Sequence, residues 1–216
     1  AIADANGNCR RFVEHPEITL PLRQDGKLDV GGAVGHNGLL GVIRDYGEGQ
    51  PYIGQVELQS GEIAEDLTYY YGVSEQIPTI CALGVLVDKT DASHVLAGGM
   101  LIQVLPGASE EAIARLEQNA ASLPPVTTML AQGLTIEEMC QKALNGFEME
   151  ILDEFQVHYA CPCSLERVQR AFLTLPKDEL LSLPDEATGL AEAKCQYCGR
   201  TYTFTKEELE LLAKKI

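Results

Sequence analysis

Short runs that are apolar-biased (39–44, 52–58) or almost wholly apolar (80–87, 100–105), separated by turn residues, mark the first half of the chain. Runs of this length between turns favour buried strands over helices. These four runs therefore predict strands. An Asn6-Gly7 pair near the start predicts a hairpin over residues 1–13. The segment 62–71 predicts a helix instead, because its apolar residues recur four apart and its acidic residues stand early.

The hydrophobic period changes to that of helices after Pro106. Ser109 fits an N-cap followed by two glutamates, and apolar residues at helical spacing continue to Leu123. Thr135 opens a second short helix that is expected to end near Gly146. Because this stretch is only modestly hydrophobic, its helices must dock on another surface to gain most of their stability.

The C-terminal part of the chain combines short helices and strands with cysteine pairs. Ser164 and Thr205 are expected to cap helices, the second of them over residues 206–215. The segment 195–200 is expected to form a knuckle between short strands. Together the patterns predict an α+β fold in three parts: a strand-rich N-terminal domain over 1–106, a helical linker over 107–150 and a small zinc-binding module over 151–216.

With 216 residues, of which 45% are hydrophobic and 22% charged, the chain is long enough for one main domain and one small one. No apolar run approaches the ~20 residues needed to span a bilayer, and no signal peptide is recognisable, so a soluble protein is expected. The chain begins with Ala1 in place of Met, and its first hairpin starts abruptly. This beginning suggests that residues are missing upstream.

The formal net charge of −16 is concentrated in the first two parts of the chain. Residues 1–150 carry 21 acidic and 8 basic groups, whereas residues 151–216 carry 11 and 8. A surface this acidic repels phosphate backbones and anionic lipids. Neither nucleic acid nor a membrane is therefore expected as a partner.

The seven cysteines are distributed unevenly along the chain. Four of them fall in two tight pairs near the C-terminus, while Cys9, Cys81 and Cys140 stand apart and are interpreted as small buried hydrophobes. The pattern differs from the disulfide framework of a small secreted protein. It indicates a metal site in a reducing compartment, which is the cytoplasm.

The paired cysteines predict one zinc ion held by four thiolates: Cys161, Cys163, Cys195 and Cys198. Closed structural zinc sites are tetrahedral and dominated by cysteine. The Cys-x-x-Cys pair aims both sulfurs inward at a turn that Gly199 eases, and Pro162 restricts the backbone of the Cys-x-Cys pair. An iron–sulfur cluster matches less well, because the long gap between the pairs is not typical of ferredoxins.

Few other residues suggest chemistry. His158 lies close to the first cysteine pair, but four thiolates already fill a tetrahedron, so this histidine is expected outside the ligand set. The other histidines have no nucleophile or carboxylate partner in the sequence pattern. Because no catalytic triad, phosphate-binding loop or paired-carboxylate motif is recognisable, the protein is not expected to be an enzyme.

Four thiolates on one ion can act as a redox switch. A module of this size buries too little apolar surface to be secure alone, and structural zinc contributes roughly 10–16 kcal/mol in small zinc peptides. The thiolate is the form that oxidants attack, and oxidised sulfurs no longer hold the metal. Oxidation is therefore expected to unfold the module.

Further motifs occur along the chain, and these are Ala64-Glu65-Asp66-Leu67, Ser74-Glu75-Gln76-Ile77-Pro78, Gly98-Gly99, Leu105-Pro106-Gly107-Ala108, Cys161-Pro162-Cys163-Ser164 and Cys195-Gln196-Tyr197-Cys198. With these motifs in this order, the chain resembles the redox-regulated 33 kDa heat-shock chaperone family over essentially its whole length. It is lighter than the family name implies and lacks the leading strand and helix of the family, which agrees with a truncated start.

The resemblance implies an ATP-independent holdase that binds unfolding client proteins under oxidative stress. It implies an inactive reduced form that holds zinc. Activation would form two disulfides, Cys161 with Cys163 and Cys195 with Cys198, and release the zinc. The helical linker would then detach and expose apolar surface for clients, and formation of a homodimer would accompany activation.

Two other functions stay open at this point. A constitutive zinc-ribbon interaction module would lose its function on oxidation, and a nucleic-acid-binding version is disfavoured by the net charge of −3 over residues 151–216. A thiol–disulfide oxidoreductase using Cys195 and Cys198 would need a helix N-terminus that lowers the pKa of one thiol. The knuckle expected at that position disfavours it.

Overall fold

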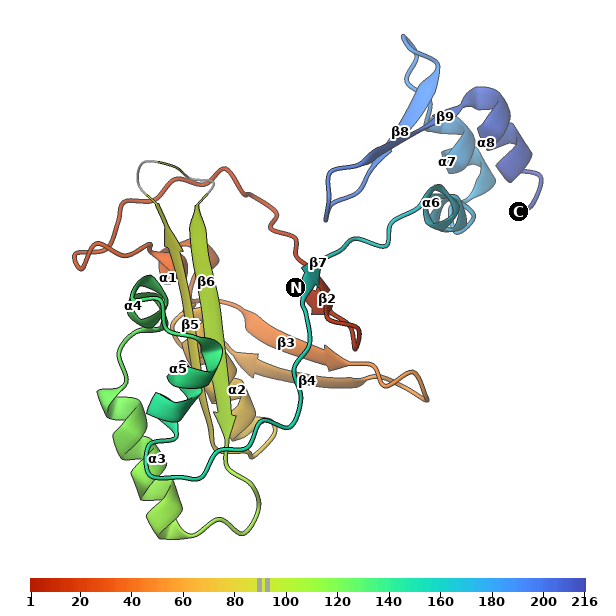
Figure 1. Cartoon of the computed structure of the whole chain (residues 1–216). Coiled ribbons are helices and arrows are strands. Elements are labelled where there is room, and N and C mark those ends of the chain that lie inside the picture. The colour runs from red at the N-terminus through yellow and green to blue at the C-terminus, as the bar shows by residue number, and fades with distance from the viewer. Residues whose placement is uncertain (89–90, 92–93) are drawn as a thin grey trace. The chain divides into compact units, whose positions relative to one another are not determined.

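The computed structural model describes residues 1–88, 91 and 94–216, and these form two compact units. One unit comprises Glu17–Glu150, and the other combines Ala1–Pro16 with Ile151–Ile216 (Figure 1). The α+β fold expected from the sequence is confirmed. The boundaries of the three-part division stay predictions, and the association of the first sixteen residues with the C-terminal part was not predicted.

Two antiparallel hairpins form the strand-rich part of the unit 17–150. The pairs are β3 (Leu39–Arg44) with β4 (Tyr52–Glu57), and β5 (Thr79–Val87) with β6 (Val95–Gln103). A short helix, α1 (Val30–Val34), precedes them, and α2 (Ile63–Val73) joins the hairpins and packs against β5. The four predicted strands and the helix are confirmed. β6 begins earlier than predicted, because Gly98 and Gly99 have low strand propensity and conceal its first half.

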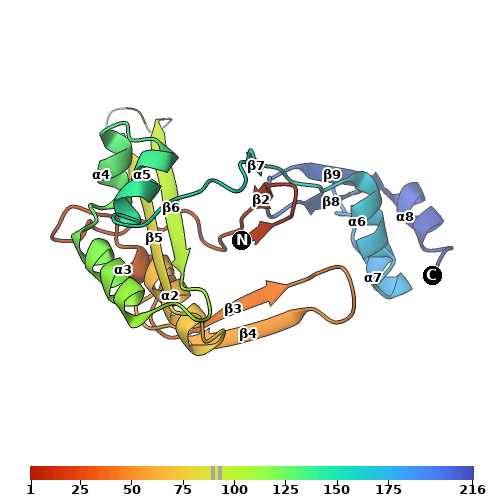
Figure 2. The ribbon, with the colours of Figure 1, turned by 60° about the horizontal axis from the view of Figure 1, so that its bottom comes forward.

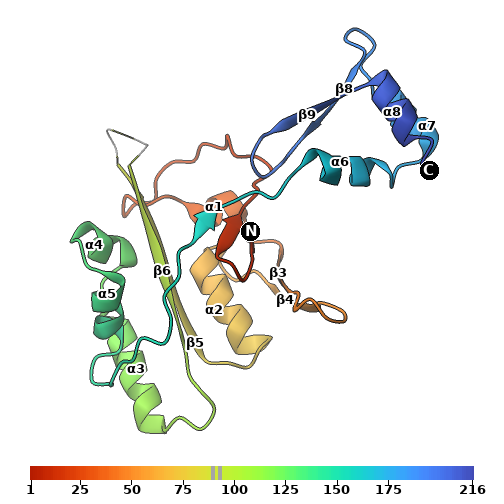
Figure 3. The same cartoon turned by 45° about the vertical axis from the view of Figure 1, so that its right-hand side comes forward.

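Three helices complete this unit: α3 (Glu110–Ser122), α4 (Val126–Ala131) and α5 (Ile136–Ala143). Both predicted N-caps are formed. The Ser109 hydroxyl accepts from the backbone N–H of Ala112, and Thr135 makes a reciprocal capping box with Glu138. α4 packs on β5 and β6, and Figure 3 shows it on the side of this hairpin opposite α2.

Two glycines let α4 lie close to the β5–β6 hairpin. Gly84 and Gly98 pair across the two strands. A Cβ on Gly84 would stand 2.8 Å from Cγ2 of Thr127, and a Cβ on Gly98 would stand 3.1 Å from Cδ1 of Leu130. The residues buried at this contact are Val126, Met129 and Met139. Helix α4 therefore owes its position to apolar packing on a part of the hairpin where two glycines leave room for it.

In the other unit, the N-terminal hairpin pairs with a strand from far along the chain. β1 (Ile2–Ala3) and β2 (Asn8–Arg10) are antiparallel, so the predicted hairpin is confirmed. β2 also pairs in parallel with β7 (His158–Tyr159), and Figure 2 shows these two strands side by side. Strands so distant in sequence leave no local pattern that would predict their pairing.

The rest of this unit is a small layered module. Its elements are α6 (Leu165–Phe172), α7 (Lys177–Ser182), β8 (Leu190–Lys194), β9 (Thr201–Thr205) and α8 (Lys206–Leu212). The expected caps Ser164 and Thr205 are formed, and α8 ends earlier than predicted. The buried core consists of Leu180, Ala191, Phe204, Leu209, Leu212 and Ala213. In the part of the chain that the structure describes, no helix is long and apolar enough to cross a membrane.

Candidate metal centre

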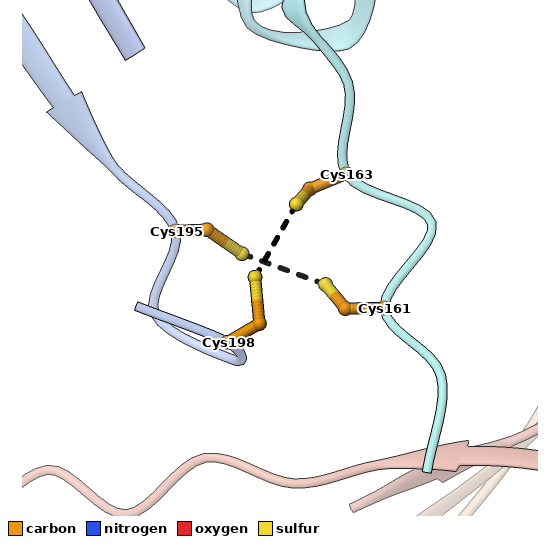
Figure 4. A group of neighbouring side chains, drawn as sticks. All are labelled: Cys161, Cys163, Cys195 and Cys198. Carbon is orange, nitrogen blue, oxygen red and sulfur yellow. Dashed lines mark hydrogen bonds between the residues drawn. The ribbon is translucent and has the colours of Figure 1, made fainter. Parts of the chain in front are cut away.

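Two separate segments of the C-terminal module bring four cysteines to one point. Cys161 and Cys163 lie in the extended segment that precedes α6, and Cys195 and Cys198 lie in the turn between β8 and β9. Figure 4 shows the four side chains pointing toward one another from these two segments. The four sequence-predicted ligands are therefore brought together.

The distances between the sulfurs fit a tetrahedral thiolate site. All four Sγ atoms lie within 4.8 Å of one another. The sulfurs of Cys161 and Cys195 are 3.6 Å apart, and those of Cys163 and Cys198 are 3.4 Å apart. Zinc–sulfur bonds of about 2.3 Å in a tetrahedron place sulfurs about 3.8 Å apart. The donor set and its spacing therefore suit one zinc ion.

The turn that carries the second pair has the form of a zinc knuckle. The backbone N–H of Gly199 donates to the carbonyl of Cys195, and the N–H of Cys195 donates to the carbonyl of Arg200, both at 2.8 Å. Gly199 has φ of 73°, a left-handed conformation that glycine adopts without strain. The knuckle expected from the sequence is confirmed, and the helix N-terminus that a thioredoxin-like site would need is not there.

The start of α6 fixes the first pair. Ser164 caps the helix by accepting from the backbone N–H of Arg167 at 3.2 Å. The Arg167 guanidinium then donates to the carbonyl of Pro162, between the two cysteines, at 3.2 Å. The Cys161–Cys163 segment is therefore held against the first turn of a helix, so its sulfurs need little further ordering to bind a metal.

The sulfurs influence one another's protonation. The backbone N–H of Cys198 and that of Tyr197, with the neighbouring thiols, lower the pKa of Cys195 to about 6. The N–H of Cys163 lowers the pKa of Cys161, but burial and the neighbouring sulfurs outweigh it and raise that pKa to about 11. The Cys195 thiolate is thus stabilised chiefly by backbone N–H groups, and the neighbouring thiols also share their protons with it. A divalent cation is a natural replacement for those shared protons.

A tyrosine and an arginine extend the site beyond its ligands. The Tyr202 hydroxyl lies 3.2 Å from Sγ of Cys163, and this hydrogen bond raises the pKa of Tyr202. The hydrogen bond to Tyr202 and the nearby thiols raise the pKa of Arg200. Sequence reasoning assigned no role to Arg200. Its position directly after the knuckle was the available signal, since metal-bound thiolates favour nearby cations.

The site is open to small solutes. Cys198 is exposed, and the other three cysteines are half-buried. Beside the sulfurs lies a hollow of about 360 Å³ whose apolar wall includes Val168 and Phe172. A small oxidant can therefore reach the sulfurs without prior opening of the module.

The remaining candidates lie elsewhere. His158 is exposed on β7 and is not part of the four-cysteine group. Cys81 and Cys140 are half-buried on β5 and α5, and burial raises the pKa of Cys81. Cys9 is exposed on β2, so its interpretation as a buried hydrophobe was wrong. It lies on a short strand at the surface, where a half-polar hairpin leaves side chains in solvent.

Comparisons with known proteins agree on one family. The family model described as Hsp33 protein matches residues 1–205. A 33 kDa chaperonin of Acetivibrio thermocellus is 45% identical over 215 residues, covering 100% of this chain and 72% of that protein. A 33 kDa chaperonin of Agathobacter rectalis is 47% identical over 208 residues, covering 96% of this chain and 71% of that protein.

A solved structure matches the fold. The crystal structure of the 33 kDa chaperonin (heat shock protein 33 homolog) of Thermotoga maritima superposes with a TM-score of 0.85 at 36% sequence identity. The match covers 97% of this chain and 70% of that one. The chain thus spans roughly seven tenths of the length of these relatives.

Proposed function

This chain belongs to the Hsp33 family of redox-regulated chaperones, which are not enzymes, and we propose how its own residues carry the switch. The carrying observation is the meeting of four sulfurs from two half-sites within 4.8 Å. We assign Cys161, Cys163, Cys195 and Cys198 as the ligands of one zinc ion in the reduced, inactive protein. The family match favours this function over the zinc-ribbon and oxidoreductase alternatives.

Bound zinc would link the start of α6 to the β8–β9 turn and keep all four sulfurs as thiolates. This link matters because the core of the module is small, with six buried residues. In small zinc peptides such a site contributes roughly 10–16 kcal/mol, which is as large as the usual stability of a whole domain. The fold of the module therefore depends on the state of its sulfurs.

Oxidation of the sulfurs by a peroxide removes these ligands in pairs. One thiolate attacks the peroxide oxygen and becomes a sulfenic acid, with one water formed after protonation. A second thiolate then attacks that sulfur, a disulfide forms, and the hydroxide leaves as a second water. Each disulfide thus takes two electrons from two thiolates, and its sulfurs are no longer thiolate ligands.

We assign the disulfides to Cys161 with Cys163 and to Cys195 with Cys198. In the reduced structure the shortest sulfur distances run between the half-sites, from Cys161 to Cys195 and from Cys163 to Cys198. Disulfides across that gap would tie the half-sites together and preserve the fold. Pairs within a half-site stay neighbours after the module opens, since one or two residues separate them, and they restrict the unfolded chain far less than links between the half-sites.

Opening of the module would free the linker helices and their apolar surface for client proteins. The apolar cluster between α4, α5 and the hairpin buries Val126, Met129 and Met139, and Ala82 and Met100 of the hairpin pack against it. Exposed apolar faces of this kind are typical of surfaces that bind other proteins. Dimerisation would accompany activation, and the net charge of −16 favours solubility while such surface is exposed. We place this activity in the cytoplasm, where thiols stay reduced until stress.

The test combines metal release with holdase activity in the full chain. The reduced, zinc-loaded protein is treated with hydrogen peroxide at mild heat, zinc is followed with a chromogenic chelator, and aggregation of a thermally unfolded client is followed by light scattering. We expect one zinc released per chain, two disulfides by peptide mapping, and suppressed aggregation only after oxidation. The zinc-ribbon alternative predicts a loss of function on oxidation. Zinc release without any holdase activity would contradict the proposal.

A further inference from the structure

One of the two side chains between Cys195 and Cys198, that of Tyr197, contacts the N-terminal segment. Tyr197 lies in the knuckle, one residue before Cys198. Its ring meets the ring of Phe12 edge-on, with centroids 6.5 Å apart and planes at 66°. The guanidinium carbon of Arg10 lies 5.1 Å from the Tyr197 ring centroid, within cation–π range. The Tyr159 hydroxyl donates to the carbonyl of Tyr197 at 2.6 Å.

Backbone hydrogen bonds extend this contact along the N-terminal segment. The N–H of His158 donates to the carbonyl of Gly7 at 2.9 Å, and the N–H of Ala160 donates to the carbonyl of Cys9 at 3.0 Å. A Cβ on Gly7 would stand 2.4 Å from the carbonyl oxygen of Gln156, so only glycine allows this approach. The hairpin and the segment leading to the metal site thus form one small three-stranded sheet, β1–β2–β7.

We propose that Tyr197 is a positioning residue through which the metal-binding turn holds residues 1–16. The chain runs between the two compact units twice, at residues 16 and 17 and at residues 150 and 151. The redox switch acts through the second of these crossings, by way of the linker. Tyr197 ties the first crossing to the same turn, so loss of the knuckle frees the N-terminal segment as well.

This role rests on the proposed metal site and adds a second route for its signal. While the knuckle is formed, Tyr197 has a fixed place in the turn between Cys195 and Cys198, and its ring presents one face to Arg10. Once the knuckle unfolds, that ring has no defined position, and residues 1–16 lose their partner in the module. β2 and β7 are very short, so their backbone pairing alone holds the segment weakly.

Hydrogen exchange on the full, reduced, zinc-loaded chain tests the role. In Tyr197→Ala, we expect exchange of residues 2–10 and 158–160 to rise by on the order of tenfold, the size expected for lost aromatic and cation–π contacts. We also expect peroxide to release zinc several-fold faster. Tyr197→Phe keeps the ring and should behave as the wild type. Gln196→Ala changes an exposed neighbour in the same turn and should also leave both readings unchanged.

A variant on the other side of the contact keeps the test decisive if Tyr197→Ala misfolds. Gly7→Ala should loosen residues 2–10 and speed zinc release while leaving the knuckle sequence intact. In the wild type, peroxide should abolish protection of residues 2–10 together with zinc release. If zinc leaves while that segment stays protected, or if Gln196→Ala matches Tyr197→Ala, the role of Tyr197 is wrong. If peroxide releases no zinc from the wild type, the proposed redox switch itself fails.

Discussion

The C-terminal module and the linker helices are both small apolar assemblies, but they are held in place by different means. The module joins a six-residue core to four sulfurs that lie at its edge. The linker helices rest on the β5–β6 hairpin through Val126, Met129 and Met139, with no ligand-type cluster among their described residues. In the proposed switch, the module senses the oxidant, and the linker helices cover apolar surface until the module opens.

In the proposed switch, an oxidant acts on the sulfurs of the module directly and on the linker helices through the chain between them. Residues 148–157 contain no helix or strand and expose large apolar side chains, among them Leu152 and Phe155. Because few contacts hold this segment, it opposes local unfolding only weakly when the module next to it unfolds. A change in either region therefore leaves the other as an internal reference.

Metal removal is expected to produce the largest difference in stability between the two regions. A strong chelator, or Cys195→Ser, should unfold the module, because a site that contributes roughly 10–16 kcal/mol in small zinc peptides is lost. Helices α7 and α8 should lose protection from hydrogen exchange, while β3–β4 should keep it. Cys9→Ser removes an exposed thiol of the same unit outside the cluster and is the matched control. A chelated module with full native protection would contradict metal-dependent folding.

Truncation of one core residue in each region gives the next largest effect. Phe204 is 2% exposed and packs on Phe172 with ring centroids 4.9 Å apart, so Phe204→Ala should destabilise the module by about 3–5 kcal/mol. Met129 is fully buried, and Met129→Ala should destabilise the docked linker by about 2–5 kcal/mol. Denaturant titration followed by hydrogen exchange measures both. Only Phe204→Ala should speed zinc release, whereas only Met129→Ala should raise holdase activity in the reduced protein.

The sequence predicted the parts of this comparison better than their connections. Local rules found the caps at Ser109, Thr135, Ser164 and Thr205, because an N-cap is decided within four residues. The four cysteines were equally recognisable, since metal spacing is short-range within each pair.

Long-range contacts could not be predicted. The pairing of β2 with β7 and the contact of Arg10 with Tyr197 join segments that share no periodic pattern. The close approach of α4 to the β5–β6 hairpin could not be predicted either, because Gly84 and Gly98 leave room for the helix only once their strands pair. Glycine in a strand indicates a close approach but does not say of what.

A side chain at Gly98 should release α4 from the β5–β6 hairpin without changing the metal site. A side chain on Gly98 would press against Leu130, so Gly98→Val should cost about 1–3 kcal/mol of docking by overpacking. We expect stronger binding of a hydrophobic dye and faster exchange in residues 126–131 of the reduced, zinc-loaded protein. Gly72→Ala on α2 is the control, since a Cβ there meets nothing within 4 Å and alanine should stabilise the helix. Unchanged exchange in α4 would show that the close contact at Gly98 does not hold the helix in place.

The smallest expected effect comes from removing the same kind of helix N-cap in each region. Thr135 and Thr205 each form a capping box, with Glu138 and Glu208 respectively. Replacing either threonine with alanine should cost about 1 kcal/mol, because one N-terminal N–H loses its acceptor and the reciprocal bond is weakened. Thr205→Ala should lower the denaturation midpoint of the zinc-loaded module and speed zinc release to a chelator, because the module is expected to stay folded only while it holds zinc. Thr135→Ala should cost the same with and without zinc. Equally fast zinc release from the two variants would mean that the regions do not differ in what stabilises them.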